Sequence, residues 1–320
     1  MTKPVIRWPL KILLLAVLAL YGGKALVKRM HMGNGPAGPV VKATAFDSPW
    51  SERKVHMLGF GDSVTRGFGA SPGQSYFELL VSNDNTTHPS MKGCDLTSVL
   101  PGLTWLNLAV NYTTSKEHWD YQIRHLRPYP HDVFGLIVIT TGGNDLIHNY
   151  GRTPPNADAL YGCTIEQAQT YGTLFQQRLH DMMSKFREVF PGGFHVFMAS
   201  IYDPTDGVGD LENVPGFSLP RWPDAIACLN LYNRILEECD REFSEVTLVD
   251  MRTTMLGHGI HFQDRENPHY KADDPHYWYF ENLEDPNDRG YDAIRRTFLN
   301  SIQQTLPPLL QPKVTHEAPR

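Results

Sequence analysis

The sequence predicts an α/β protein in which a central, parallel, five-stranded sheet lies between two layers of helices. Short apolar or β-branched runs alternate with longer segments of helical periodicity, as in successive βαβ units. The runs show no alternation of polar and apolar residues, which is expected when helices cover both faces of a sheet. With 320 residues, 41% of them hydrophobic and 20% charged, the chain is long enough to form one large core.

Each predicted strand is one of these apolar runs, and the five runs cover residues 55–60, 104–110, 133–141, 194–200 and 246–251. The predicted helices follow the strands, at residues 74–82, 115–126, 164–190 and 223–243 and from about residue 285 onwards. Pro223 and Pro286 are expected at the first positions of the last two helices, because the fixed φ of proline suits the first turn. Asp285 fits the N-cap of the last helix. An apolar stripe marks the buried face of that helix, formed by Tyr291, Ile294, Phe298 and Ile302.

The N-terminal part of the chain differs in composition from the rest. A basic start is followed by the apolar run ILLLAVLALY at 12–21, so residues 1–29 are expected to be a cleaved signal peptide or an uncleaved signal-anchor helix. Either interpretation predicts export to the periplasm or the extracellular space, with a membrane tether in the second case. Residues 30–50 are rich in Gly and Pro and are expected to be a linker. The folded domain is expected over 51–310, followed by a disordered tail at 311–320.

The charge and the cysteine content argue against only a few classes of function. The net charge of −6 and the lack of a basic stretch beyond the N-terminus argue against a nucleic-acid partner. No CxxC spacing suggests a metal site. If a disulfide forms, Cys94–Cys163 is the simplest pair, and buried free thiols are the alternative.

Three polar turns follow the first three predicted strands. They contain Gly61-Asp62-Ser63, the segment 107–115 and Gly142-Gly143-Asn144. The carboxyl ends of parallel strands meet at one edge, where ligands bind, so these turns are expected to converge on one crevice. Two long loops, at 202–221 and 252–284, should border the same edge. The sequence thus predicts Ser63 as a nucleophile and the Asn144 amide as a hydrogen-bond donor to an oxyanion.

The combination of GDS at 61–63 with GxND at 142–145 resembles the SGNH, or GDSL-type, hydrolases over residues 55–305. The resemblance implies a three-layer α/β/α, flavodoxin-like fold and ester hydrolysis with no metal or organic cofactor. It implies an oxyanion hole made by the backbone N–H groups of Ser63 and Tyr112 and the side chain of Asn144. The family usually has glycine where this chain has Tyr112.

The last block of the family pattern, Asp-x-x-His, is altered in this sequence. Asn282 stands in the place of the aspartate and Asp285 in the place of the histidine. The base is therefore expected elsewhere in the 252–284 loop, with His276 oriented by Asp273 as the first choice. His261 is the alternative, followed by His269.

The substrate class stays open at this stage, and so do several rival functions. A small-molecule, lipid or acylated-saccharide ester fits the predicted serine mechanism. The altered last block also allows a non-catalytic binding protein on the same fold, and an O-acyltransferase would use the same residues. A metal-dependent hydrolase is a further alternative, because imidazoles and carboxylates crowd the 252–284 loop, namely His258, His261, Asp264, His269 and Asp273.

Overall fold

A computed structural model describes residues 29–147, 160–214 and 217–311. Its centre is a five-stranded sheet in the order β2-β1-β3-β4-β5, and every neighbouring pair of strands is parallel. The strands are β1 (Lys54–Gly61), β2 (Leu103–Asn107), β3 (Val133–Thr140), β4 (Phe194–Ala199) and β5 (Val246–Val249). This confirms the predicted fold class and all five predicted strands. The chain passes from β1 to β2 on one side and then returns to β3 on the other side of β1. This reversal of the strand order leaves a crevice beside the carboxyl end of β1.

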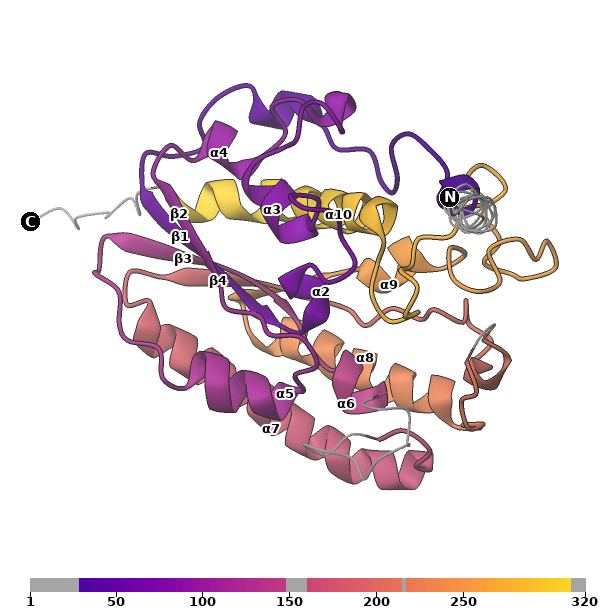
Figure 1. Cartoon of the computed structure of the whole chain (residues 1–320). Helices are drawn as coiled ribbons and strands as arrows, with labels where there is room; N and C mark the ends of the chain where they lie inside the picture. The colour runs from indigo at the N-terminus through magenta and orange to yellow at the C-terminus, as the bar shows by residue number, and fades with distance from the viewer. Residues whose placement is uncertain (1–28, 148–159, 215–216, 312–320) are drawn as a thin grey trace, which may run out of the picture.

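Helices cover both faces of the sheet, which explains the continuous apolar character of the strands (Figure 1). One face packs against α3 (Tyr76–Val81), α4 (Leu96–Val99), α9 (Met251–Met255) and α10 (Asp288–Leu309). The other packs against α7 (Ile165–Val189) and α8 (Ala225–Glu242). Alternate residues of one strand enter the two cores: Met57 of β1 packs under α10, and its neighbour Leu58 packs over α7.

The remaining helical segments of the described residues are short. Three are α-helical: α2 (Ser63–Arg66), α5 (Ser115–Glu117) and α6 (Gly143–Ile147). The π-helical turn η3 (His118–Ile123) continues α5. The 3₁₀ turns are η1 (Ala43–Phe46), η2 (Pro89–Met91) and η5 (Leu211–Asn213).

Two predicted helix starts are wrong. Helix α8 is preceded by Asp224 at its N-cap, so Pro223 lies outside the helix. Helix α10 begins at Asp288, and Asn287 is its N-cap, with the Asn287 side chain accepting from the N–H groups of Arg289 and Gly290. Asp285 therefore has no capping role. The predicted apolar stripe of α10 is buried as expected.

Residues 33–50, expected to be a linker, instead belong to the folded domain. Ala37, Val41 and Phe46 are buried in the core beside α10. The Ala37 N–H donates to Asp292 Oδ2 at 3.2 Å, and Arg289 Nη1 donates to the carbonyl of Asn34 at 2.6 Å. The Gly and Pro content of residues 30–50 suggested a linker and could not show that this backbone packs on α10.

The expectations for the termini and the cysteines have different outcomes. The predicted signal or anchor at 1–29 and the tail at 311–320 fall almost entirely outside the described residues. Within the described ranges, no helix is both long and apolar enough to cross a bilayer. All four cysteines are free thiols, and Cys163 interacts with Cys228, so the Cys94–Cys163 pair is not formed.

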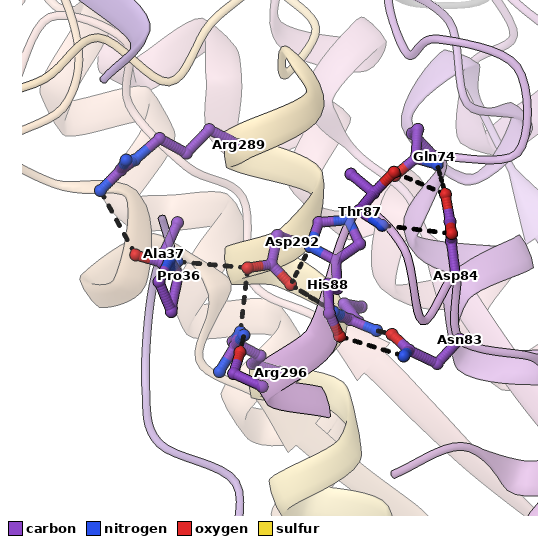
Figure 2. A network of polar contacts seen from close by, with 12 residues as sticks. Pro36, Ala37, Gln74, Asn83, Asp84, Thr87, His88, Arg289, Asp292 and Arg296 are labelled. Carbon is purple, nitrogen blue, oxygen red and sulfur yellow. Dashed lines mark hydrogen bonds and ion pairs between the residues drawn. The ribbon is translucent and has the colours of Figure 1, made fainter. Parts of the chain in front are cut away.

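A buried ion-pair network ties α10 to its surroundings (Figure 2). Asp292 lies at its centre, with Oδ1 at 2.7 Å from Arg295 Nη2 and Oδ2 at 3.0 Å from Arg296 Nε. Arg295 is fully buried and also donates to Asn83 Oδ1 at 2.6 Å. His88 Nδ1 lies 3.6 Å from Asp292 Oδ1. The charges of Asp292, Arg295 and Arg296 depend on one another for compensation, because all three side chains are buried.

We expect Asp292→Ala to lower the free energy of unfolding by about 3–5 kcal/mol, because it leaves two buried guanidinium groups without their carboxylate. Urea unfolding followed by circular dichroism measures the change. The matched control is Asp132→Ala, which breaks the exposed pair between Asp132 and Lys54 and should leave the midpoint unchanged. Equal effects of the two substitutions would contradict this account of the network.

Candidate active site

Ser63 lies at the first turn beyond β1, where a tight backbone approach fixes its position. Gly61 has φ 114°, and a Cβ at this position would lie 2.0 Å from the Thr140 carbonyl oxygen. Only glycine can occupy such a position without moving β3. Asp62 then caps α2, accepting from the Val64 N–H at 3.1 Å. Ser63 follows as the first helical residue and is partly exposed.

The second turn, residues 108–114, is held against the first by buried side-chain amide and hydroxyl groups. Gln122 of η3 accepts from the Gly61 N–H at 2.9 Å and donates to the Gly61 carbonyl at 2.8 Å. The Thr113 hydroxyl contacts both residues: it lies 3.1 Å from the Gly61 carbonyl oxygen and 3.3 Å from Gln122 Nε2. Tyr112 has φ 66°, the left-handed conformation that favours glycine. The tyrosine therefore keeps the backbone conformation that the family's usual glycine would adopt.

The third turn supplies Asn144, whose side chain is buried and oriented. Its Nδ2 donates one hydrogen to the Thr113 carbonyl at 3.0 Å, which leaves the second hydrogen of that amide for a ligand. His118 Nε2 lies 3.1 Å from the same carbonyl oxygen, and His118 Nδ1 lies 3.0 Å from Thr141 Oγ1. Because a carbonyl only accepts, Nε2 carries the proton. Burial lowers the pKa of His118 to about 3, so the ring is neutral.

Two further residues fix the start of α5 against α6. Asp145 accepts from the Ser115 N–H at 2.8 Å and from the Ser115 hydroxyl, and Arg178 Nη1 lies 3.7 Å from Asp145 Oδ1. Gln122 and His118 could not be identified from the sequence, because the short segment 115–126 shows only that a helix forms there. Their roles depend on how η3 packs against β1.

The carboxylate of Asp62 is buried beside Ser63. Its Oδ1 accepts from Thr140 Oγ1 at 2.7 Å as well as from Val64. Burial raises the pKa of Asp62 to about 7, the hydrogen bond from Thr140 opposes this, and the nearby carboxylates of Asp285 and Asp145 add to it. Asp62 therefore titrates near neutral pH and lacks the full charge of an ordinary aspartate there.

Asp285 also lies next to Ser63, which the sequence did not predict. Its carboxylate is 2% exposed, and the Ser63 hydroxyl is one of the three influences on its pKa. Burial raises that pKa, and hydrogen bonds with Ser63 and Asn282 lower it. At strict hydrogen-bond geometry Oδ1 of Asp285 has no partner in the described part of the chain. The hydroxyl is thus near but imperfectly aligned, as is common in active sites without substrate.

The predicted histidines lie elsewhere and make their own contacts. His276 Nδ1 is 2.5 Å from Asp274 Oδ1, whereas Asp273 was its expected partner. His276 and Asp273 line a cavity with Arg289 that does not include Ser63. His261 Nε2 is 2.9 Å from Asp210 Oδ1. His269 packs against Gly207, where a Cβ would be 3.0 Å from its ring.

The catalytic roles of His276, His261 and Asp273 therefore stay predictions that these contacts do not support. His258, the remaining histidine of this loop, stacks on Trp278. In the described ranges, no three His, Cys, Asp or Glu side chains come together closely enough to hold a metal ion.

Ser63 lines a cavity of about 100 Å³ that is partly open to solvent. Asp62, Asn144 and Glu284 also line it. Its apolar lining includes Leu146 and Ile147 of α6, Trp222 before α8, and Ala225, Ile226 and Leu229 of α8. A mostly apolar cavity with a few convergent polar groups is typical of a small-molecule site.

The fold is a three-layer α/β/α sandwich, and the candidate site lies in the crevice at the carboxyl edge of its sheet. Residues 60–293, more than half of the chain, match the family model described as the GDSL-like lipase/acylhydrolase family. The chain belongs to this family, which supports an ester hydrolase at family level. No curated protein sequence matches the chain.

Several solved structures are similar to this chain at low identity. A lipase, Lip_vut3, from a goat rumen metagenome is 17% identical, with 78% of this chain and 97% of that chain covered and a TM-score of 0.46. An extracellular lipase from Streptomyces rimosus is 15% identical, with 77% and 99% covered and a TM-score of 0.47. A phospholipase A1 from Streptomyces albidoflavus NA297 is 16% identical, with 77% and 98% covered and a TM-score of 0.46. Membership of the family rests on the sequence match.

We expect Asp62 to make the protein less stable as the pH rises from about 4 to 7. The folded state holds a proton on Asp62 up to about pH 7, whereas the unfolded state releases it near 3.8, so stability falls on the order of 1 kcal/mol per pH unit between these values. Asp62→Asn keeps a good N-cap residue and should remove this slope. Urea unfolding at several pH values measures it.

The control for this measurement is Asp84→Asn. Hydrogen bonds from Thr87 and Thr86 lower the pKa of Asp84 to about 2, so this residue should contribute no slope above pH 4. If Asp62→Asn and the wild-type protein lost stability in parallel from pH 4 to 7, the raised pKa of Asp62 would be disproved.

Proposed function

We propose that the protein is a serine-dependent ester hydrolase in which Ser63 is the nucleophile. The observation that carries this proposal is the position of Ser63 at the mouth of the apolar cavity, beside the buried and oriented amide of Asn144. Membership of a lipase/acylhydrolase family supports the same reaction class. The proposed reaction forms an acyl-enzyme on Ser63 Oγ, which water then hydrolyses.

The oxyanion of the tetrahedral intermediate is proposed to bind three N–H donors. These are the backbone N–H groups of Ser63 and Tyr112 and the free hydrogen of Asn144 Nδ2. The left-handed φ of Tyr112 is consistent with a turn that directs its N–H towards the crevice. Donors that are fixed before the substrate binds stabilise the charge without reorganisation during the reaction.

The composition of the cavity favours an acyl chain as the part of the substrate that is buried. Its walls are aliphatic along α6 and α8, and an acetylated sugar would place hydroxyl groups against them without hydrogen-bond partners. We therefore propose a lipid-like or other long-chain ester rather than an acetylated saccharide. Export and a membrane tether remain proposals that rest on the composition of residues 1–29.

We expect a fluorophosphonate probe to label the wild-type protein and not Ser63→Ala, because only an activated serine reacts with it. Asn144→Ala should keep the label and lower kcat for p-nitrophenyl octanoate by about 10²–10³-fold, the usual loss of one oxyanion donor. Labelling followed by mass spectrometry and steady-state kinetics measure both effects.

Failure of the wild-type protein to react with either probe would favour the rival interpretation, a binding protein on the same fold. An added alcohol acceptor that captured the acyl group in preference to water would favour an O-acyltransferase. Activity that survived Ser63→Ala would disprove the serine mechanism.

We expect Leu229→Trp to change the preference for acyl chain length, because a larger side chain from α8 would fill the cavity. The ratio of kcat/KM for p-nitrophenyl octanoate over p-nitrophenyl acetate should fall about tenfold or more. The control is Leu174→Trp on α7, a residue that is 43% exposed, which should leave the ratio unchanged. An unchanged ratio in Leu229→Trp would show that the acyl chain lies elsewhere.

A further inference from the structure

We propose that Asp285, and not a histidine, is the general base that activates Ser63, and that Asn282 positions it. This inference rests on the proposed role of Ser63 as nucleophile. It concerns the two residues that break the Asp-x-x-His pattern. The Asp285 carboxyl interacts with the Ser63 hydroxyl, and Asn282 binds Asp285.

The two oxygens of the Asp285 carboxylate have different surroundings. Oδ2 accepts from Asn282 Nδ2 at 2.6 Å. Oδ1 is buried and has no hydrogen-bond partner at strict geometry among the described residues. The Ser63 hydroxyl interacts with this carboxylate and lowers its pKa. A carboxylate with one oxygen anchored and the other unoccupied beside a hydroxyl is arranged to accept that hydroxyl's proton. The Asp285 carboxylate does not cap a helix, because Asn287 is the N-cap of α10.

The backbone around Asp285 is held from several sides. The Asp285 N–H donates to Asn282 Oδ1 at 3.2 Å, so the two residues bind each other reciprocally. The Phe280 N–H donates to the Asp285 carbonyl at 2.7 Å. Between them, Leu283 has φ 70°, an uncommon conformation for a residue with a γ-branched side chain. Strained positions of this kind persist where neighbouring contacts fix them, and they are frequent at functional sites.

The same segment packs directly on the turn that carries Ser63. A Cβ on Gly69 would lie 3.0 Å from the Pro286 carbonyl oxygen, and the Phe68 ring meets the Phe280 ring edge to face. The Tyr291 hydroxyl donates to the Phe68 carbonyl at 2.7 Å. Asp288 Oδ1 accepts from the Ser71 N–H at 2.6 Å. These contacts fix the base relative to the nucleophile without a histidine between them.

Burial raises the pKa of Asp285, and the hydrogen bonds with Ser63 and Asn282 only partly oppose this. The titratable groups that interact electrostatically with Asp285 are Asp62 before α2, Tyr202 in the loop after β4 and Tyr291 of α10, and Asp285 raises the pKa of each of them. No lysine, arginine or histidine in the described ranges is among the causes that shift its pKa. A buried carboxylate with no cation beside it is a stronger base than an ordinary aspartate.

The proton transfers balance without a cofactor. As the Ser63 Oγ–carbon bond forms, the hydroxyl proton moves to Asp285. The protonated Asp285 then gives this proton to the leaving alcohol oxygen as the ester C–O bond breaks. In deacylation Asp285 takes a proton from the attacking water and returns it to Ser63 Oγ when the acyl bond breaks. The carboxylate and the serine end as they began.

The test compares variants that keep the shape of the site, assayed with p-nitrophenyl octanoate and the fluorophosphonate. Asp285→Asn should lower kcat and the rate of labelling by about 10²–10⁴-fold. Asp285→Asn should not lose stability at neutral pH, since it removes a buried charge, so loss of folding can be recognised by urea unfolding. The matched control is Asp264→Asn, an exposed aspartate of the 252–284 loop, which should retain activity within a few-fold.

The pH profile of kcat/KM separates a base from a structural residue. In the wild-type protein, the apparent pKa below which kcat/KM falls should be higher than 3.8, the ordinary pKa of an aspartate. Asn282→Asp places a second carboxylate against Asp285 and should raise this apparent pKa. The double variant Asn282→Asp/Asp285→His restores the family pattern, and its apparent pKa should move towards about 6.5, the range of an imidazole.

The outcomes distinguish failure of this inference from failure of the proposed function. Full activity in Ser63→Ala would overturn the serine mechanism itself. Loss of activity in Ser63→Ala together with near-normal activity in Asp285→Asn would leave the nucleophile intact and overturn the inference. Loss in His276→Gln or His261→Gln with a wild-type profile in Asn282→Asp would also overturn it.

Discussion

The site depends on one backbone oxygen, the carbonyl of Thr113. It accepts from Asn144 Nδ2 and from His118 Nε2, so it joins the turns after β2 and β3. The Thr113 hydroxyl and Gln122 connect the same turn to Gly61 after β1. Parallel strands bring these three turns to one edge, but only the buried hydrogen bonds fix them to the accuracy that catalysis requires. The neutral state of His118 is part of this constraint, since its Nδ1 has to accept from Thr141.

The crevice also contains two carboxylates in an unfavourable environment. Asp62 and Asp285 are both buried and interact electrostatically, and burial raises the pKa of both. No cation of the described residues is among the causes that shift either pKa, in contrast to Asp292, which is paired with two arginines. A protein that keeps such residues gives up stability at the site, and this is the usual relation between stability and activity in enzymes. Within the segment 285–292, Asp292 therefore supports the fold, whereas Asp285 is available for chemistry.

Much of the fold was predictable because it depends on local patterns. Continuous apolar runs identified all five strands, and the positions of Ser63 and Asn144 followed from their places after β1 and β3. The role of Asp285 was missed because Asp-Pro is a good local signal for a helix start, whereas the helix begins at Asp288 with Asn287 as its cap. The place of Asp285 in the family pattern was the signal that could have indicated its position. Spacing alone pointed to His276 and Asp273, but the loop folds so that His276 meets Asp274 in a different cavity.

The anchoring of residues 33–50 on α10 has a consequence for how the domain is presented to its surroundings. The chain enters the folded part at the carboxyl edge of the sheet, where the carbonyl of His31 accepts from the Tyr277 N–H and Gly33 touches the His276 ring (Figure 1). The first described residues thus lie on the same side of the molecule as the carboxyl edge of the sheet. If a surface held the N-terminal segment, the mouth of the crevice would face that surface. An ester embedded in the surface could then reach the crevice without diffusing through bulk water.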